Sequence, residues 1–419
     1  MTAPHPPRGN GRVVVVGSSV AGVRTAQALR AEGHQGEVLL VGEEHELPYD
    51  KPPLSKGLLV GGTDVESIRL LTQDQAAQAG IELLLGHRAL RIQVAGRRLL
   101  LADHDPVGYD HLVIATGARA RPSRWGSRPG VHLLRTLADA ADLRGDLLAG
   151  GPVVVVGGGF VGAEVASAAR TMGLRVTVVD PLPVPMTSVL NEQIGGWFAD
   201  LHRRHGVDTR FGTGVAAIDG ERGAFSVRLT DGSAVPAATV VVGIGAHPND
   251  EWVADSGLLV DDGVVCDEYC RAVEAADVYA AGDVARWMHP HRQVSTRIEH
   301  WTNAVEQAAC VAHNLVHPDD LRAYAPVEYV WSDQHDWRMQ VIGRTGGPLE
   351  HVVLGDPSVD GRFVALYTGD GTELAGAVVV NWPRALLVCR RALRDGARLA
   401  EVRTRIEQLA PPGPLRTGP

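Results

Sequence analysis

Two glycine-rich turns hold the residues best placed to do chemistry. Each follows a run of four valines, and the turns read GSSVAG over residues 17–22 and GGGFVG over residues 157–162. In such a turn the first glycine permits the bend, the last lets a helix lie close to the strand, and the helix N-terminus offers N–H donors to a pyrophosphate. Serine replaces the usual middle glycine in the first copy. The candidate contacts are Gly17, Ser19, Ala21 and Gly22 in the first turn and Gly157, Gly159 and Gly162 in the second.

Each turn is followed by a second apolar strand with an acid at its end. Glu43 follows the strand expected over residues 37–41, and Asp180 follows the strand over 176–179. A carboxylate at this place accepts hydrogen bonds from ribose hydroxyls. No arginine follows Asp180, so this acid favours NADH and repels the 2′-phosphate of NADPH. Two such sites in one chain are what a flavoprotein needs to take hydride from a nicotinamide.

A proline-rich segment over residues 47–56 reads LPYDKPPLSK, and two of its prolines fix an extended turn. We expect Ser55 to cap a short helix there. The segment resembles the P-Y-[DE]-[RK]-P-P-L-S-K signature of the NAD(P)H-dependent ferredoxin and rubredoxin reductases, which are FAD enzymes of the oxygenase-coupled type. The resemblance places Lys51 at the FAD and Lys56 beside the flavin ring.

The acid Glu164, taken alone, is a first-turn residue that complements the helix dipole. In related flavoproteins with two nucleotides, a glutamate here pairs with the lysine beside the flavin. The resemblance therefore implies that Lys56 and Glu164 form an ion pair and act as the catalytic pair. It extends over roughly residues 12–400 and implies further cofactor contacts, namely Ala89, Ala115, Thr116, Gly117, Arg135, Gly245, Gly282, Asp283 and Trp301.

The elements that must position these residues indicate an α/β fold. We expect two doubly wound, Rossmann-like dinucleotide domains followed by a C-terminal α+β domain. The FAD-binding domain would comprise residues 1–119 and 247–325, and the NAD-binding domain would comprise residues 120–246. The C-terminal domain would run over 326–419, with strands near 328–331, 339–342, 362–367 and 374–380, helices near 383–395 and 399–409, and a disordered tail from 410.

Composition excludes several classes of protein. The net charge of −9 makes wholesale nucleic-acid binding unfavourable, and the sequence has no apolar run of about 18 residues that would span a membrane. The N-terminus has no secretory signal pattern, so we expect a cytoplasmic protein. The four cysteines form no C-x-x-C pair and no zinc set, so we expect reduced thiols and no metal.

The function that these features indicate is electron transfer from NADH through FAD to a ferredoxin or rubredoxin that serves a cytochrome P450 or an oxygenase. Two alternatives stay open: an NADH oxidase or peroxidase, and a flavoprotein resembling apoptosis-inducing factor. We expect a monomer or weak homodimer. The arginines within residues 384–398 either form a docking face for an acidic ferredoxin or are a solvated basic face; they are Arg384, Arg390, Arg391, Arg394 and Arg398.

Overall fold

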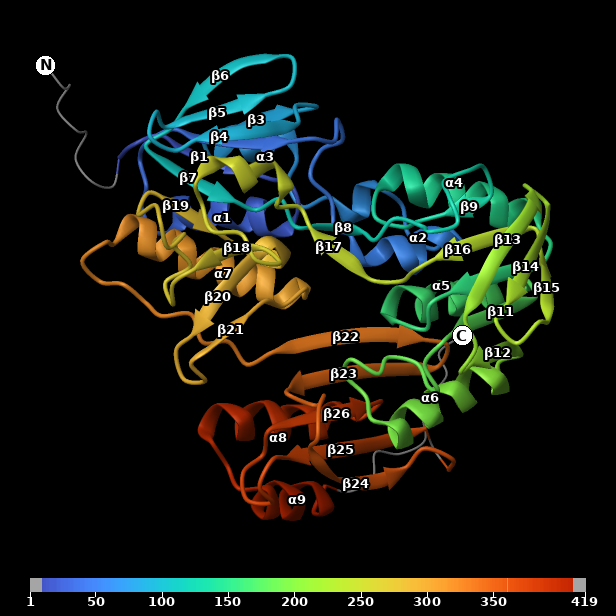
Figure 1. The fold of residues 1–419 in the computed structure, drawn as a ribbon. Coiled ribbons are helices and arrows are strands. Elements are labelled where there is room, and N and C mark those ends of the chain that lie inside the picture. Colours follow the sequence, from blue (N-terminus) through green and yellow to red (C-terminus); the bar gives the residue numbers. More distant parts are fainter. Residues whose placement is uncertain (1–9, 360, 410–419) are drawn as a thin grey trace, which may run out of the picture. The chain divides into compact units, whose positions relative to one another are not determined.

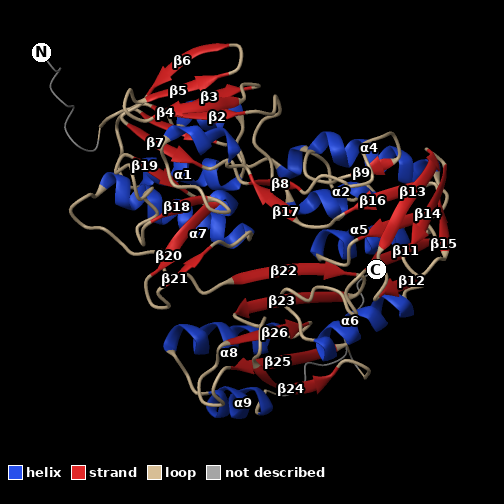
Figure 2. Cartoon of the chain, viewed as in Figure 1, coloured by secondary structure: helices blue, strands red, loops and turns tan. Residues whose placement is uncertain are grey.

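A computed structural model describes residues 10–359 and 361–409. The described chain divides into two compact units, which Figures 1 and 2 draw with their helices and strands labelled. The first unit takes residues 10–51, 64–119 and 246–326, and the second takes 52–63, 120–245 and 327–409. Each unit is described by itself.

The first unit is built on a five-stranded parallel sheet with the order β19-β7-β1-β2-β3. The four valines of β1 are all buried, because a central parallel strand is covered on both faces. Helix α1 connects β1 to β2, and α7 packs against α1. The bounds are β1 Val13–Val16, α1 Val20–Ala31, β2 Val38–Gly42, β3 Ile81–Leu85, β7 His111–Ile114, β19 Val278–Ala280 and α7 Trp301–Val316.

Smaller elements complete the first unit. An antiparallel meander of three strands, β4-β5-β6, comprises Ala89–Gln93, Arg98–Leu101 and His104–Gly108. A second three-stranded sheet, β18-β20-β21, comprises Val264–Cys266, Ala285–His289 and Val294–Thr296. The short pieces are η2 Glu66–Ile68, α3 Gln73–Gln78, β8 Ala118–Ala120, β17 Ala246–Pro248, η3 Glu251–Ser256 and η4 Gly282–Val284.

The second unit repeats the parallel design. Its first sheet has the order β12-β11-β10-β16-β9, and its central strand β10 is again four buried valines. An antiparallel meander, β13-β14-β15, lies between β12 and β16 in the sequence. The strands are β9 Val131–His132, β10 Val153–Val156, β11 Val176–Asp180, β12 Val207–Phe211, β13 Val215–Glu221, β14 Ala224–Leu229, β15 Ala234–Ala237 and β16 Thr239–Val242. The helices are η1 Pro52–Ser55, α2 Gly57–Val60, α4 Leu137–Ala149, α5 Phe160–Thr171 and α6 Glu192–Arg204.

The C-terminal part of the second unit is an antiparallel sheet, β22-β23-β26-β25-β24, with helices α8 and α9. One apolar cluster joins this sheet to α6 through Phe198 and Trp337, and another joins it to α8 and α9 through Cys389 and Val402. The bounds are β22 Tyr329–Gln334, β23 Trp337–Gly343, β24 Glu350–Asp356, β25 Arg362–Thr368, β26 Gly376–Val380, α8 Pro383–Asp395 and α9 Leu399–Glu407.

The predicted α/β fold class is confirmed, with one difference in the C-terminal part. Strand β24 was not predicted, because its sequence EHVVLGD has acids at both ends and only three apolar residues. The helices predicted near 383–395 and 399–409 are present as α8 and α9, and α8 ends at Asp395 with Gly396 in the left-handed conformation. Arg398 is the N-cap of α9. The expected tail from 410 lies outside the described residues. Within the described ranges, no helix is both long and apolar enough to cross a membrane.

Candidate functional site

The first glycine-rich turn joins β1 to α1 and needs its two outer glycines. Gly17 has φ +117°, and a Cβ added to it would lie 2.1 Å from the carbonyl oxygen of Ala115. A Cβ on Gly22 would lie 1.8 Å from the carbonyl oxygen of Gly17. Ser19 is the N-cap of α1, and its side chain makes no capping hydrogen bond. The start of α1 therefore lies close to the strand. The Ser19 side chain occupies none of the N–H groups at this helix end, so they can bind an anionic phosphate.

Further predicted residues lie beside this turn, at the ends of the neighbouring strands. Gly17 follows β1, Ala115 follows the neighbouring strand β7, and Gly282 follows β19, which pairs with β7. A Cβ on Gly282 would lie 2.9 Å from the Cβ of Ala21, so η4 begins against the first turn of α1. The carboxyl ends of three adjacent parallel strands thus meet at one edge, where doubly wound sheets bind nucleotides. Thr116 and Gly117 continue from β7, and the Thr116 hydroxyl donates to the carbonyl of Asn249 (2.8 Å).

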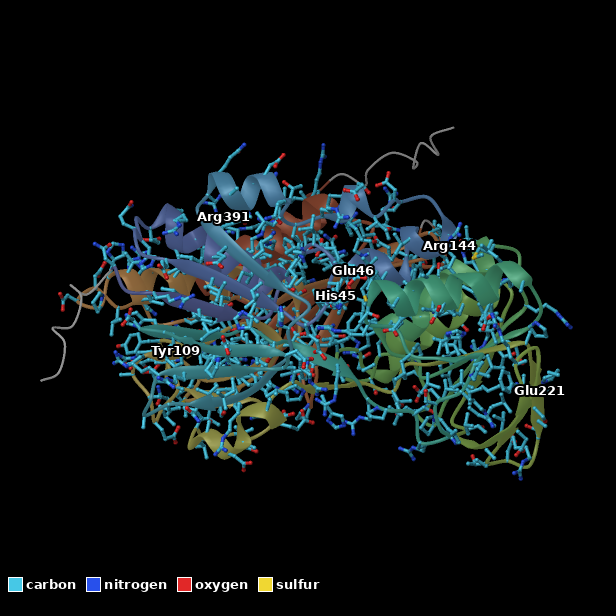
Figure 3. The ribbon with its side chains drawn as sticks, turned by 90° about the horizontal axis from the view of Figure 1, so that it is seen from above. His45, Glu46, Tyr109, Arg144, Glu221 and Arg391 are labelled. Carbon is cyan, nitrogen blue, oxygen red and sulfur yellow. The ribbon has the colours of Figure 1, made fainter. Side chains whose placement is uncertain are left out.

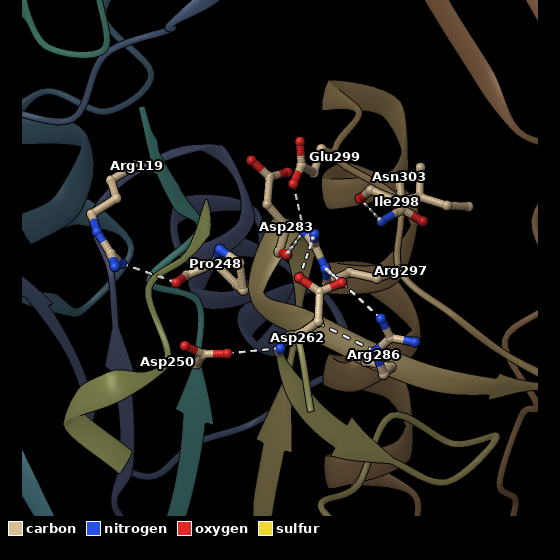
Figure 4. A network of polar contacts seen from close by, with 11 residues as sticks. Arg119, Pro248, Asp250, Asp262, Asp283, Arg286, Arg297, Ile298, Glu299 and Asn303 are labelled. Atoms are coloured by element: carbon tan, nitrogen blue, oxygen red, sulfur yellow. Dashed lines mark hydrogen bonds and ion pairs between the residues drawn. The ribbon is translucent and has the colours of Figure 1, made fainter. Parts of the chain in front are cut away.

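Asp283 is the middle residue of η4, which follows β19. Its carbonyl oxygen accepts a hydrogen bond from Arg297 Nη1 (3.0 Å), and Arg297 also pairs with Asp262 (3.0 Å) and Glu299 (2.6 Å). Figure 4 shows this network around Asp283, with Arg286 reaching Asp262 as well. The backbone that carries the predicted FAD contact is therefore held by the side chain of Arg297, which is 12% exposed.

The segment before residue 52 is tied to α7 and to the loop after β2. Trp301, the first residue of α7, donates its indole N–H to Asp50 Oδ1 (2.7 Å). Lys51 Nζ lies 2.8 Å from Glu44 Oε1, and the Tyr49 hydroxyl donates to the same carboxylate.

Glu43 is the acid that the sequence favours for the ribose. Its side chain is 69% exposed, and its carboxylate lies 3.6 Å from Arg88 Nε. Ala89 begins β4 directly after that arginine. The contacts of Glu43 and Ala89 with FAD stay predictions.

In the second unit, the second glycine-rich turn has the same design. Gly157 has φ +109°, and a Cβ added to it would lie 2.2 Å from the carbonyl oxygen of Gly243. A Cβ added to Gly162 would lie 2.0 Å from the carbonyl oxygen of Gly157. Gly159 is the N-cap of α5. Asp180 is held at the turn, since its Oδ2 accepts from the Gly158 N–H (2.6 Å) and its Oδ1 from the Leu182 N–H (2.8 Å). A fixed negative charge therefore lies beside the turn that would hold the nicotinamide dinucleotide.

Two other predicted contacts lie in this unit. Gly245 has φ +104°, and its carbonyl accepts from the Arg121 N–H (2.9 Å). Arg135 precedes α4, and its backbone N–H donates to Asp139 Oδ2 (2.9 Å), next to the capping box that Thr136 and Asp139 form.

The expected ion pair between Lys56 and Glu164 is present, with both residues in the second unit. Lys56 Nζ lies 2.8 Å from Glu164 Oε1, and the glutamate side chain is only 6% exposed. Ser332 on β22 donates its hydroxyl to the same oxygen (2.6 Å). Ser55 donates to the other oxygen, Oε2, and does not cap a helix as predicted, since the N-cap of α2 is Lys56. Three donors thus contact the two oxygens of one buried carboxylate.

A chain of hydrogen bonds continues from Ser332 that the sequence did not reveal. Gln334 Nε2 donates to Ser332 Oγ (3.1 Å), and Gln334 Oε1 faces His202 Nε2 (3.3 Å), which must therefore carry the proton. His202 Nδ1 then accepts from His335 Nε2 (3.1 Å). Burial lowers the pKa of His202 to about 4 and that of His335 to about 3, so both rings are neutral near pH 7. The available signal was the alternation in β22, which puts Ser332 and Gln334 on one face.

Comparison with known proteins agrees with this geometry. Residues 11–308 match the family model of the pyridine nucleotide-disulphide oxidoreductases, and residues 329–408 match the reductase C-terminal domain. The chain is 40% identical to rhodocoxin reductase of Rhodococcus erythropolis, over 91% of this chain and 89% of the relative. It is also 40% identical to the ferredoxin–NAD(+) reductase component of the anthranilate 1,2-dioxygenase system of Burkholderia cepacia, over 92% and 94%.

A solved structure of similar fold is the ferredoxin reductase for the CYP199A2 system of Rhodopseudomonas palustris. It matches with a TM-score of 0.89 and 34% identity, covering 93% of this chain and 96% of that one. These relatives are reductases, and the similarity covers nearly the whole length of both chains. The chain that contains the glycine turns and the buried glutamate is thus similar to reductases throughout. The chain belongs to the pyridine nucleotide-disulphide oxidoreductase family and is an oxidoreductase that uses FAD and NADH.

Proposed function

We propose that this enzyme passes electrons from NADH through FAD to a ferredoxin or rubredoxin-type iron–sulfur protein, which in turn serves a cytochrome P450 or an oxygenase. The similar proteins support this acceptor, since they include ferredoxin reductase components of dioxygenase systems and the putidaredoxin reductase of Pseudomonas putida. The structural observation that carries the proposal is the buried Glu164 carboxylate with its lysine and serine donors.

When bound, FAD supplies the conversion of a two-electron hydride donor into a one-electron donor, which an iron–sulfur acceptor requires. The protein's own part is binding and charge. We assign the FAD pyrophosphate to the turn of Gly17 and Gly22, with Asp283 and Glu43 as acceptors for hydroxyl groups of the cofactor. We assign NADH to the turn of Gly157 and Gly162, where Asp180 accepts from the ribose.

The proposed role of Lys56 is to hold a positive charge beside the flavin ring. The half-buried ammonium group of Lys56 has a partner in the buried Glu164 carboxylate, at 2.8 Å. Ser55 and Ser332 hold the glutamate on both oxygens, so the carboxylate and hence the ammonium keep one position. Such a fixed charge would stabilise negative charge that develops when hydride arrives.

Three of the four cysteines favour this function over an NADH oxidase or peroxidase that works through a reactive thiol. The fourth, Cys310, is half-buried, and its hydrogen bond with Cys270 lowers its pKa. Cys266, Cys270 and Cys389 are buried, and burial raises the pKa of Cys266 and Cys270 well above normal and that of Cys389 to about 12. A thiol with a raised pKa is a poor nucleophile. All four cysteines are free, which supports a place in the reducing cytoplasm as part of the proposal. We also propose that the protein is a monomer or a weak homodimer.

Steady-state reduction of cytochrome c by NADH, with and without added ferredoxin, tests the proposal. Reduction that depends on ferredoxin supports it. Rapid oxygen or peroxide consumption that ferredoxin does not change would instead support an oxidase. A protein that binds FAD but oxidises no NADH would support the role resembling apoptosis-inducing factor.

A further inference from the structure

A second cluster of side chains, in the first unit, has the composition of a metal site. It consists of Glu32, His313 and His317, whose ligand atoms all lie within 4.8 Å of one another. His313 and His317 are one helical turn apart at the C-terminal end of α7, and Glu32 is the C-cap of α1. The sequence predicted no metal here, because the glutamate and the histidines are far apart in the chain.

The distances suit a small divalent cation. Glu32 Oε2 lies 3.2 Å from His313 Nδ1 and 3.0 Å from His317 Nε2. Two nitrogen or oxygen ligands of tetrahedral zinc, each at about 2.0–2.1 Å, lie roughly 3.3 Å apart. Two edges of this triangle therefore already have the required length. His313 is buried, whereas Glu32 and His317 are half-buried, so the cluster is reachable from solvent.

The proton positions at His313 are compatible with an ion, and also with an imidazolium, since Asp320 Oδ2 lies 3.6 Å from Nε2. His313 Nε2 lies 2.8 Å from the carbonyl oxygen of Asp320, which only accepts, so Nε2 carries a proton. The neutral ring then has a bare Nδ1, and this nitrogen faces a carboxylate oxygen, which also only accepts. Either His313 is a buried imidazolium, or a cation lies between Nδ1 and Glu32. A ligand histidine that donates its second N–H to a backbone carbonyl is the usual arrangement at metal sites.

The surrounding helices also favour a positive charge. Glu32 and His317 both cap helix C-terminal ends, where backbone carbonyls leave a partial negative charge. The N-terminal parts of the same two helices meet at Gly282, since a Cβ there would lie 2.9 Å from Ala21 and 3.6 Å from Ala304. An ion at the cluster would thus fasten α1 to α7 at the ends opposite their contact with η4.

We propose that Glu32, His313 Nδ1 and His317 Nε2 bind one divalent transition-metal ion of the zinc class, with water completing the coordination. The ion would be structural, joining α1 to α7. Two imidazoles and one carboxylate favour Cu²⁺ and Zn²⁺ over Co²⁺ and Mn²⁺, and do not select Mg²⁺ or Ca²⁺. The proposal does not depend on the identity of the electron acceptor.

Equilibrium dialysis of the untagged, FAD-loaded enzyme against buffered Zn²⁺ tests it, with metal counted per FAD by mass spectrometry. We expect one tightly held Zn²⁺ per FAD. Glu32→Gln and His317→Gln should each weaken binding at least about 100-fold, since even the loss of an outer partner of a metal ligand weakens binding by roughly 10–100-fold. His104→Gln is the matched control, because His104 also lies beside a second histidine, His87, but has no carboxylate ligand with it.

A second readout keeps the test independent of misfolding. Each variant must retain FAD at the wild-type ratio, and the temperature at which FAD fluorescence is released should rise with Zn²⁺ in the wild type and in His104→Gln only. Less than a tenth of an equivalent of Zn²⁺ in the wild type, or equal zinc content in wild type, Glu32→Gln and His317→Gln, would overturn the proposal. The first result would mean that the cluster holds no zinc, and the second would place the zinc elsewhere.

Discussion

Replacing Glu164 with glutamine removes one charge from the centre of the proposed catalytic pair and little else. Glu164 Oε1 accepts from Lys56 and Ser332, and Oε2 accepts from Ser55. A glutamine can keep its carbonyl oxygen toward Lys56 and turn its amide toward Ser55, whose hydroxyl can accept as well as donate. The hydrogen-bond count then survives, and the loss is the difference between a charged and a neutral acceptor for the ammonium group.

That difference sets the expected magnitude. Hydrogen bonds to charged groups contribute about 1.5–3 kcal/mol and neutral ones about 0.5–1.5. Lys56 is 21% exposed, so solvent screens part of the loss, and we expect Glu164→Gln to lower the free energy of unfolding by roughly 1 kcal/mol. Glu164→Ala, which leaves three donors without their acceptor, should lower it by about 3–5 kcal/mol.

The kinetic effect is the sharper test. Stopped-flow absorbance of the flavin measures its reduction by NADH, and Glu164→Gln should slow it roughly tenfold, equivalent to about 1.4 kcal/mol, at unchanged FAD content. Lys56→Met should slow it at least as much. Glu66→Gln is the control, because Glu66 also forms an ion pair, with Arg69, but its side chain is 75% exposed. If Glu164→Gln and Lys56→Met both reduce at the wild-type rate, the pair has no catalytic role.

Three further predictions concern the coenzyme, pH and the acceptor. Asp180→Ala should narrow the preference for NADH over NADPH ten- to a hundredfold in kcat/KM, since about 1.5–3 kcal/mol of charged hydrogen bonding is lost; equal wild-type use of the coenzymes contradicts the argument. His202 stays neutral in the fold down to about pH 4, whereas the unfolded ring takes a proton near 6.5, so stability falls as pH drops below 6.5, by up to about 1.4 kcal/mol per unit from this residue. Urea unfolding from pH 7 to 5 should show a shallower loss for His202→Asn, and an unchanged slope would refute this. Reversing Arg384 and Arg391 to glutamate should raise the KM for ferredoxin and flatten its salt dependence while ferricyanide reduction stays constant; wild-type behaviour across a salt series would place docking elsewhere.

The arginine prediction rests on residues 384–398, of which only those up to Asp395 belong to helix α8. Arg391 is labelled in Figure 3, and its side chain is 78% exposed and 3.5 Å from Asp395. Arg390 lies over the ring of Tyr329, 4.9 Å from its centre, so its charge is partly engaged. Because Gly396 ends α8, Arg398 does not continue its stripe. Arg384 and Arg391, two turns apart on α8 and both exposed, are therefore the better pair to reverse.

Short sequence patterns predicted the features that depend on residues close together in the chain. The valine runs and the outer glycines of both turns specify buried strands and close helix packing by themselves, and the structure contains both. The ion pair of Lys56 and Glu164 joins distant segments, and only resemblance to a family indicated it. Ser55 illustrates the limit of local reasoning, since a hydroxyl before a short helix usually accepts a hydrogen bond from a helix N–H. Here Lys56 is the N-cap instead, and the Ser55 hydroxyl donates to the distant Glu164 carboxylate.

Long-range side-chain networks left almost no signal in the sequence. Ser332, Gln334 and His202 come together because β22 and α6 bring them to one place, and the alternation in β22 reveals only that Ser332 and Gln334 share a face. The cluster of Glu32 with two α7 histidines has the same origin. The i, i+4 spacing of those histidines was visible, but the third ligand depends on how α1 packs against α7.

The central claim is that electrons leave NADH through this protein for an iron–sulfur acceptor. Anaerobic reduction of ferredoxin by NADH, followed spectroscopically with a catalytic amount of the enzyme, tests it most directly. We predict rapid reduction that requires the enzyme, with two ferredoxins reduced for each NADH consumed, because a hydride carries two electrons and the acceptor takes one. If NADH reduces the enzyme-bound flavin while ferredoxins from the same organism stay oxidised, the claim is wrong.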